Sequence, residues 1–248
     1  GLLPLCFGEA TKFSADLLDA DKTYEATVRL GATTTTGDAE GETLKVRSVV
    51  TGETELRAVL PRFTGKIRQV PPMYSALKKH GRPLYELARQ GVEVEREARE
   101  VTIHALELLA YEAETARIRV TCSKGTYVRT LAEDIGEALG CGAHLTALRR
   151  TAVGRLSLNA AVTLETIDAC PEGERDRLLA PVDSLLQDFA AVSLEPAAAQ
   201  RFGNGNPVPA VPAPGLYRVY AEGRLLGVGR GDEAGLLHPK RLIATGND

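Results

Sequence analysis

The chain has 248 residues, 25% of them charged, and a formal net charge of −3. This length allows one large hydrophobic core, or one core plus a small second domain. The net charge excludes a globally basic nucleic-acid-binding protein, so any RNA contact would need local basic patches. The sequence has no apolar run long enough to span a membrane and no signal peptide. Its four cysteines lie far apart, without the spacing of a metal site or a disulfide framework, so we expect a cytoplasmic protein.

The N-terminal part predicts a short helix over Phe7–Leu18 and then a strand over Tyr24–Leu30, whose residues alternate between apolar and polar. Tyr24 falls on the apolar side of this strand, so the residues alone favour a core tyrosine. The following stretch, Thr33–Gly41, is a polar loop without core residues. Asp38 is the only side chain in this loop that is suited to chemistry.

The middle of the chain predicts a helix over Thr54–Phe63 and then a segment that is rich in basic residues. Pro71 and Pro72 exclude a central strand or helix at the start of this segment. Its basic side chains are interleaved with Tyr74 and Tyr85 and are Lys78, Lys79, His80, Arg82 and Arg89. This composition suits phosphate contacts and stacking on unpaired bases, but a solvated basic helix over Pro83–Gln90 remains the alternative.

Two alternating runs, Val101–Leu109 and Ala116–Cys122, predict an antiparallel pair of strands, the second with a basic outer side. After a sharp turn at Gly125 the apolar period becomes helical, and Gly140 suits the end of this helix. Ser123 or Thr126 is expected to cap its N-terminus.

Arg129 lies in the first turn of this predicted helix, where the helix dipole disfavours a cation. Sequences tend to break such local rules at functional sites, so we expect Arg129 to have an anionic partner, either a carboxylate or a phosphate. On position alone, a solvated arginine is an equally good interpretation.

The C-terminal part predicts a helix and a Pro-Val-Asp turn within Thr163–Leu186, and the composition changes from Phe189 onward. Prolines and glycines become frequent, and a hairpin through Glu222–Gly223 joins two short alternating runs. We therefore predict a mixed α+β fold, with a mostly antiparallel central sheet and flanking helices, followed by a small β domain.

Several motifs in a fixed order resemble the bacterial TruB-type tRNA pseudouridine synthases. They are Gly-Glu-Ala-Thr-Lys-Phe from Gly8, Asp-Lys-x-Tyr ending at Tyr24, the glycine- and threonine-rich loop Gly31–Gly41, Pro-Pro-Met-Tyr-Ser-Ala-Leu-Lys from Pro71, Thr-Tyr-Val-Arg ending at Arg129, and Gly-Cys-Gly-Ala-His-Leu ending at Leu145, with Leu-Arg-Arg from Leu148. Because these motifs cover most of the chain, the resemblance is specific.

The resemblance implies a pseudouridine synthase domain over residues 1–188, with an RNA-gripping insertion at about 69–100, and a PUA-like RNA-binding domain over 189–248. It further implies a cofactor-free enzyme that isomerises uridine 55 in the T-loop of tRNA after base flipping. No protein partner is implied, and we expect a monomer. By the same resemblance, Arg129 and Tyr24 are catalytic and Tyr24, Tyr127 and Leu148 hold the base. Lys78, Lys79 and Arg82 would contact RNA, and Arg149 and Arg150 could reach phosphate.

Gly1 matches the last glycine of the family motif that contains the nucleophilic aspartate, so this aspartate is expected just upstream of Gly1 and paired with Arg129. Two alternatives stay open. The chain could be a non-catalytic tRNA-binding or tRNA-folding module, or a hydrolase that uses Glu133 or Asp134 beside Arg129, although an Arg–Glu pair at this spacing is usually a helix-face ion pair.

Overall fold

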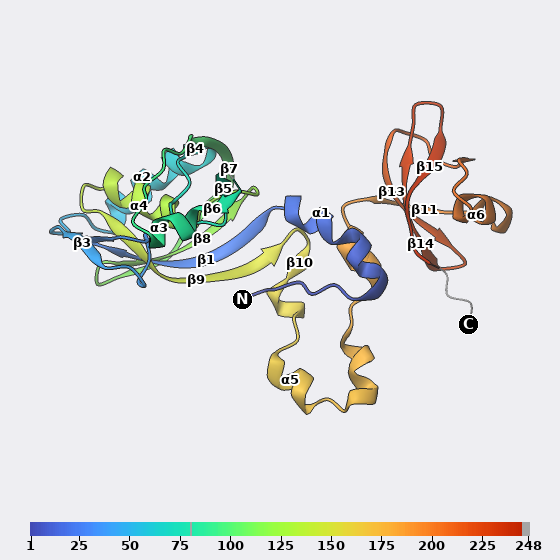
Figure 1. Cartoon of the computed structure of the whole chain (residues 1–248), viewed down its shortest axis with the longest axis horizontal. Coiled ribbons are helices and arrows are strands. Elements are labelled where there is room, and N and C mark those ends of the chain that lie inside the picture. The colour runs from blue at the N-terminus through green and yellow to red at the C-terminus, as the bar shows by residue number, and fades with distance from the viewer. Residues whose placement is uncertain (80, 245–248) are drawn as a thin grey trace. The chain divides into compact units, whose positions relative to one another are not determined.

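The computed structural model describes residues 1–79 and 81–244, which form two compact units (Figure 1). Unit 1 comprises Gly1–Leu2 and Asp19–Gly154, and unit 2 comprises Leu3–Leu18 and Arg155–Asp248. This division differs from the sequence-based boundary at 188/189. In unit 2, Leu186 shares a buried cluster with Phe13 and Val228, which explains why the residues before 188 group with the C-terminal part.

Unit 1 is built on antiparallel strands in the order β9-β1-β8-β7-β4. Their bounds are β1 Lys22–Leu30, β4 Gly65–Gln69, β7 Arg99–Glu112, β8 Thr115–Cys122 and β9 Ala143–Val153. The smaller elements of the unit are β2 Ala32–Thr34, β3 Thr43–Val46, α2 Glu53–Val59, η2 Leu60–Phe63, β5 Lys78–Lys79, β6 Arg82–Pro83, α3 Leu84–Arg89 and α4 Val128–Ala138. The mostly antiparallel sheet with flanking helices is thus confirmed.

The strand pairing that the sequence predicted is present, since Leu106 pairs with Val120 and Leu108 with Ile118. The alternating residues of β8 are buried in one core with apolar side chains of α2 and α4. On the other face, Arg119 contacts Glu25 at 3.0 Å and Glu107 at 3.4 Å, so the predicted basic side of β8 is matched by glutamates on the neighbouring strands.

Helix α4 begins and ends at glycine-containing turns, as predicted. Gly125 and Gly140 both have a φ of +81°, which favours glycine. The capping prediction is wrong, because the N-cap residue is Tyr127 and no side chain caps it. Thr126 Oγ1 instead donates to the Ser123 carbonyl, and Ser123 Oγ accepts from the Thr102 N–H.

Unit 2 contains a five-stranded sheet in the order β11-β13-β14-β15-β12. Its strands are β11 Ala190–Ser193, β12 Val208–Pro209, β13 Gly215–Ala221, β14 Arg224–Gly231 and β15 Leu236–Leu242. Helix α6, Pro196–Gly203, contributes the buried Phe202 to the core of this sheet. The predicted C-terminal β domain and its hairpin, with Ala221 opposite Arg224, are confirmed.

The remaining part of unit 2 consists of short elements. They are η1 Gly8–Phe13, α1 Ser14–Asp19 (whose last residue belongs to unit 1), β10 Leu156–Ser157, η3 Leu158–Ala160, α5 Leu164–Ala169, η4 Glu172–Leu178 and η5 Val182–Leu186. The helix expected within Thr163–Leu186 is therefore only six residues long, and two 3-10 helices of seven and five residues follow it after Pro171 and Pro181. Within the described residues, no helix has the length and apolar character of a membrane span.

Candidate active site

Arg129 holds together three segments of unit 1. Its Nη1 atom donates to Asp38 Oδ2 at 2.9 Å and to the Thr36 carbonyl at 3.3 Å, and its Nη2 atom donates to the Tyr74 carbonyl at 2.6 Å. The Arg129 and Asp38 side chains are only 24% and 25% exposed. The prediction that Arg129 has an anionic partner is thus confirmed, and within the described residues that partner is the Asp38 carboxylate.

The loop that carries Asp38 is folded around this carboxylate. Thr36 Oγ1 and the Glu40 N–H both donate to Asp38 Oδ1, at 2.5 Å and 3.2 Å. The loop is attached to β9, because the Leu145 N–H donates to the Gly37 carbonyl at 3.0 Å. Partial burial alone would raise the pKa of Asp38, but the hydrogen bonds from Thr36, Glu40 and Arg129 lower it below its usual value. The Asp38 carboxylate is therefore ionised at neutral pH.

In the part of the chain that the structure describes, neither carboxylate of the hydrolase alternative forms an ion pair with Arg129. Burial raises the pKa of Glu133 and the negative charge of Asp134 adds to this effect, while the nearby positive charge of Arg129 opposes it without reversing it. Burial also raises the pKa of Asp134. The expected helix-face pair between Arg129 and Glu133 is absent from the described ion pairs, because the guanidinium turns toward the Asp38 loop instead.

Tyr24, Leu148 and Arg150 lie together on one face of the sheet. Tyr24 of β1 is paired with Arg150 of β9, and Ala26 is paired with Leu148. Directly opposite residues of an antiparallel pair point to the same face, as do alternate residues of one strand. Leu148 is 48% exposed, so its side chain is free to contact a ligand.

Tyr24 packs against the core of unit 1 but is only half-buried. Burial raises the pKa of its hydroxyl, and the neighbouring positive charge of Arg150 opposes this effect. The phenol therefore stays protonated at neutral pH and is a hydrogen-bond donor.

The first residues of the chain lie against the same strand. The Leu2 N–H donates to the Arg150 carbonyl at 2.7 Å, and Arg150 Nε donates to the Leu2 carbonyl at 2.8 Å. A Cβ atom on Gly1 would lie 2.9 Å from Arg150 N, so glycine is required for this approach. The N-terminus is thereby held next to the residue that pairs with Tyr24.

Tyr127 precedes α4, and its backbone is held by a side chain that sequence reasoning missed. Gln69 Oε1 accepts from the Tyr127 N–H at 3.0 Å, and Gln69 Nε2 donates to the Tyr127 carbonyl at 3.3 Å. The only signal in the sequence was a polar residue at the inward position of β4, directly before the Val-Pro-Pro stretch.

The basic insertion (residues 69–100) forms a two-stranded sheet, β5 and β6, followed by α3. Lys78 and Arg82 are exposed, whereas Lys79 donates to the Glu95 carbonyl at 2.6 Å. The Arg89 guanidinium lies over the Tyr85 ring, 5.5 Å from its centroid. Arg149 is exposed on β9. His80, which belongs to the predicted basic set, lies outside the described residues.

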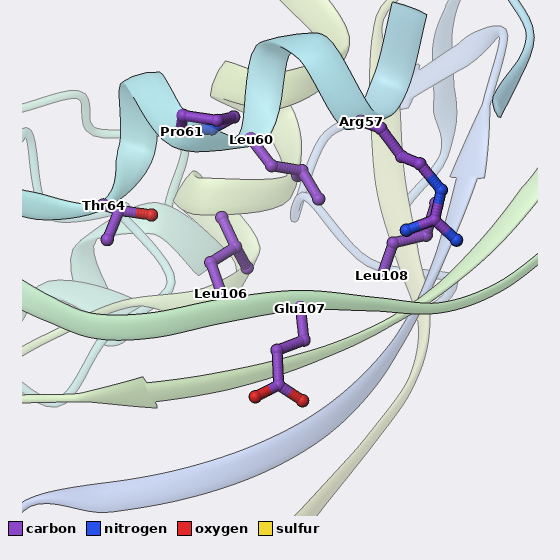
Figure 2. Close-up of a pocket in the computed structure, with 7 residues that line it drawn as sticks. All are labelled: Arg57, Leu60, Pro61, Thr64, Leu106, Glu107 and Leu108. Carbon is purple, nitrogen blue, oxygen red and sulfur yellow. The ribbon is translucent and has the colours of Figure 1, made fainter. Parts of the chain in front are cut away.

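A separate open groove of ≈ 770 Å³ lies between η2 and β7 (Figure 2). Leu106 and Leu108 point into it from the strand, and Leu60 points down from the helix, whereas the Glu107 side chain extends away from the groove. None of its lining residues belongs to the predicted site, so the chemistry is not assigned to this groove.

Three family models match consecutive parts of the chain. The first, described as TruB family pseudouridylate synthase (N terminal domain), matches residues 1–128. The second, tRNA pseudouridylate synthase B C-terminal domain, matches residues 129–187. The third, Pseudouridine synthase II TruB, C-terminal, matches residues 190–243.

Individual proteins agree with these models. The chain is 61% identical to tRNA pseudouridine synthase B of Burkholderia mallei and 59% identical to that of Dechloromonas aromatica, and it covers 84% and 82% of their lengths. The alignments include 99% and 98% of the present chain. Among solved structures, a Cbf5-Nop10-Gar1 complex matches with a TM-score of 0.68 and 25% identity, covering 93% of this chain and 66% of the other. An H/ACA RNP bound to a substrate RNA, 19% identical, has the same fold.

Proposed function

The chain belongs to the TruB family of tRNA pseudouridine synthases, and we propose from this that its site converts uridine 55 in the T-loop of tRNA into pseudouridine. The observation that best supports the proposal is the arrangement around Arg150. There, the Gly1–Leu2 backbone is held beside the strand that places Leu148 and Tyr24 on one face.

The reaction requires a nucleophile, and we assign this role to an aspartate immediately upstream of Gly1. Leu2 is hydrogen-bonded to Arg150, which is itself paired with Tyr24, so a residue upstream of Gly1 would enter next to this strand. Within the described residues, Arg129 uses its Nη1 and Nη2 atoms for hydrogen bonds, while its Nε–H has no acceptor. This N–H can donate a hydrogen bond to a second carboxylate. The positive charge would keep that carboxylate ionised, and the hydrogen bond would fix its orientation. Arg129 would then be shared between the nucleophile and Asp38.

The chemistry needs no external reactant. The aspartate breaks the bond between the sugar and N1 of the base, the base turns over, and carbon C5 forms the new bond to the sugar. The base loses a proton at C5 and gains one at N1, so atoms and electrons balance within the substrate. Tyr24, Tyr127 and Leu148 would hold the detached base by stacking and shape. The uridine must first leave its stack, at a cost of a few kcal/mol.

A direct test compares this chain with the same chain extended upstream to include the aspartate. Only the extended protein is expected to isomerise uridine in a T-loop tRNA transcript, and changing the aspartate to asparagine should abolish its turnover. Isomerisation by residues 1–248 alone would contradict the assignment and move the search to Asp38. If neither form isomerises uridine but both bind tRNA, the result would support the binding-module alternative. The names of the curated relatives do not favour this alternative.

The basic insertion is proposed to bind phosphates through Lys78, Lys79 and Arg82. Replacing all three with glutamine is expected to weaken tRNA binding across sequences and to reduce the slope of log Kd against log salt by up to about 3, since each lost phosphate contact lowers it by roughly 1. The salt dependence of fluorescence anisotropy measures both quantities.

The matched control for this triple variant replaces three exposed basic residues elsewhere in unit 1, Lys45, Arg57 and Arg62. The control should leave the affinity and the salt slope close to those of the parent protein. Equal effects of the two triple variants would reveal a general charge effect, and an unchanged slope in the insertion variant would favour a solvated basic helix.

We also propose that residues 189–248 act as the PUA-like RNA-binding domain and that residues 1–188 act as the catalytic domain. The family models change between residues 187 and 190, which supports a functional boundary there. A cytoplasmic monomer that needs no protein partner remains our expectation for the whole enzyme.

A further inference from the structure

Gln69 is a buried polar side chain whose hydrogen bonds join two functional parts of unit 1. It is only 2% exposed at the end of β4, where the basic insertion begins. Its carboxamide accepts from the Tyr127 N–H and donates to the Tyr127 carbonyl, at 3.0 Å and 3.3 Å. Both ends of the amide are thus satisfied by one residue, 58 positions along the chain.

These hydrogen bonds fix the backbone at the start of α4. The N-terminal N–H groups of a helix have no partners within the helix, and here no side chain of the N-cap residue supplies one. A buried donor or acceptor that is left without a partner destabilises the folded state. The Gln69 amide therefore favours a single position of Tyr127, two residues before Arg129.

A second contact connects the same two parts. The Tyr74 carbonyl, five residues after Gln69, accepts from Arg129 Nη2 at 2.6 Å. Pro71 and Pro72 lie between these two attachment points and restrict the backbone there. The stem of the basic insertion, residues 69–74, is thus tied to the beginning of α4 at both of its ends.

We propose that Gln69 is a positioning residue that links the RNA-binding insertion to the base pocket by fixing the Tyr127 backbone. The link rests on the proposed function in one respect, namely that Tyr127 lines the pocket for the flipped base. The contacts of Gln69 and of the Tyr74 carbonyl then fix the position of RNA held by the insertion relative to Tyr127 and Arg129.

The test uses Gln69→Met, which keeps the size of the side chain but removes both hydrogen bonds, and Gln69→Glu, which keeps only the acceptor. Hydrogen exchange by mass spectrometry of free protein should show about tenfold faster exchange in a peptide containing Tyr127 for Gln69→Met, because its N–H loses its partner. Gln69→Glu should preserve most of this protection, since its carboxylate still accepts from the same N–H.

In the extended enzyme, Gln69→Met is expected to lower kcat about tenfold while the Kd for a tRNA transcript changes by less than about twofold, because a displaced pocket residue affects the reacting geometry more than the phosphate contacts. Gln69→Glu should fall between the parent and Gln69→Met. Val59→Ala, a substitution of a buried core residue in α2, serves as the control for lost stability and should alter neither the local exchange nor kcat.

Unchanged exchange at Tyr127 in a folded Gln69→Met protein would overturn the link, whatever the activity. Equal losses of kcat in Gln69→Met and in Val59→Ala would overturn it as well, because general destabilisation would then explain both. If the parent enzyme does not isomerise uridine, the proposed function fails. The exchange measurement still decides whether Gln69 fixes Tyr127.

Discussion

Replacing Arg129 with lysine is expected to lower kcat for uridine isomerisation about 10²-fold or more, while the Kd for tRNA stays within about twofold. Lysine keeps the positive charge but cannot reach the Asp38 carboxylate, the Thr36 carbonyl and the Tyr74 carbonyl together, as the guanidinium does. The proposed nucleophile would then lose its fixed direction. Single-turnover kinetics on a tRNA transcript, with binding measured separately, provides the test.

Arg47→Lys is the matched control for this experiment. Arg47 also pairs with a carboxylate of α4, since its Nη1 atom lies 2.8 Å from Glu137 Oε2, but this ion pair is at the surface. Exposed pairs contribute little, so the control should keep nearly full turnover. If Arg129→Lys retained the parent kcat, the charge alone would suffice and the directing role of the guanidinium would be wrong.

Replacing Tyr24 with phenylalanine should reduce kcat by about 10²-fold to 10⁴-fold if the hydroxyl moves a proton in the reaction, with little change in tRNA binding. Phenylalanine keeps the ring surface that packs against the core and that we propose to contact the base. Because burial raises the pKa of the Tyr24 hydroxyl, the group begins the reaction protonated. The loss should therefore be the same throughout the neutral pH range.

Tyr111→Phe gives the corresponding control on β7. Tyr111 also has a hydroxyl whose pKa is raised by burial, and it donates to the Thr51 carbonyl at 3.1 Å. Its loss should cost about 1 kcal/mol of stability without slowing turnover. Turnover of Tyr24→Phe equal to that of the parent would reduce Tyr24 to a packing residue.

Much of the fold could be predicted because its signals are local. The alternation in Ala116–Cys122 identified the inward face of β8, and Gly125 and Gly140 marked both ends of α4. The capping prediction failed for a physical reason, since Ser123 is engaged by the Thr102 N–H of a neighbouring strand. Such competition between partners depends on the tertiary structure.

The candidate site was less predictable, because its contacts join distant positions. An anionic partner for Arg129 followed from its place in the first turn of the helix, but Asp38 lies 91 residues away. The loop was recognised as polar and Asp38 as its only chemical group, yet nothing in the sequence states a distance between the two. Gln69 was missed altogether, since a single inward polar residue carries no periodic signal.

The central position of β1 has a consequence for how unit 1 can form. Among the described strands, β1 pairs only with ones that come much later in the chain, as Lys22 and Cys122 are 100 positions apart and Thr23 and Thr151 are 128 apart. During synthesis, β1 therefore leaves the ribosome long before either of its neighbours exists. The loop-closure entropy must be overcome before any of its ladder forms. Until β8 and β9 emerge, its apolar residues remain exposed to chaperones and to other nascent chains.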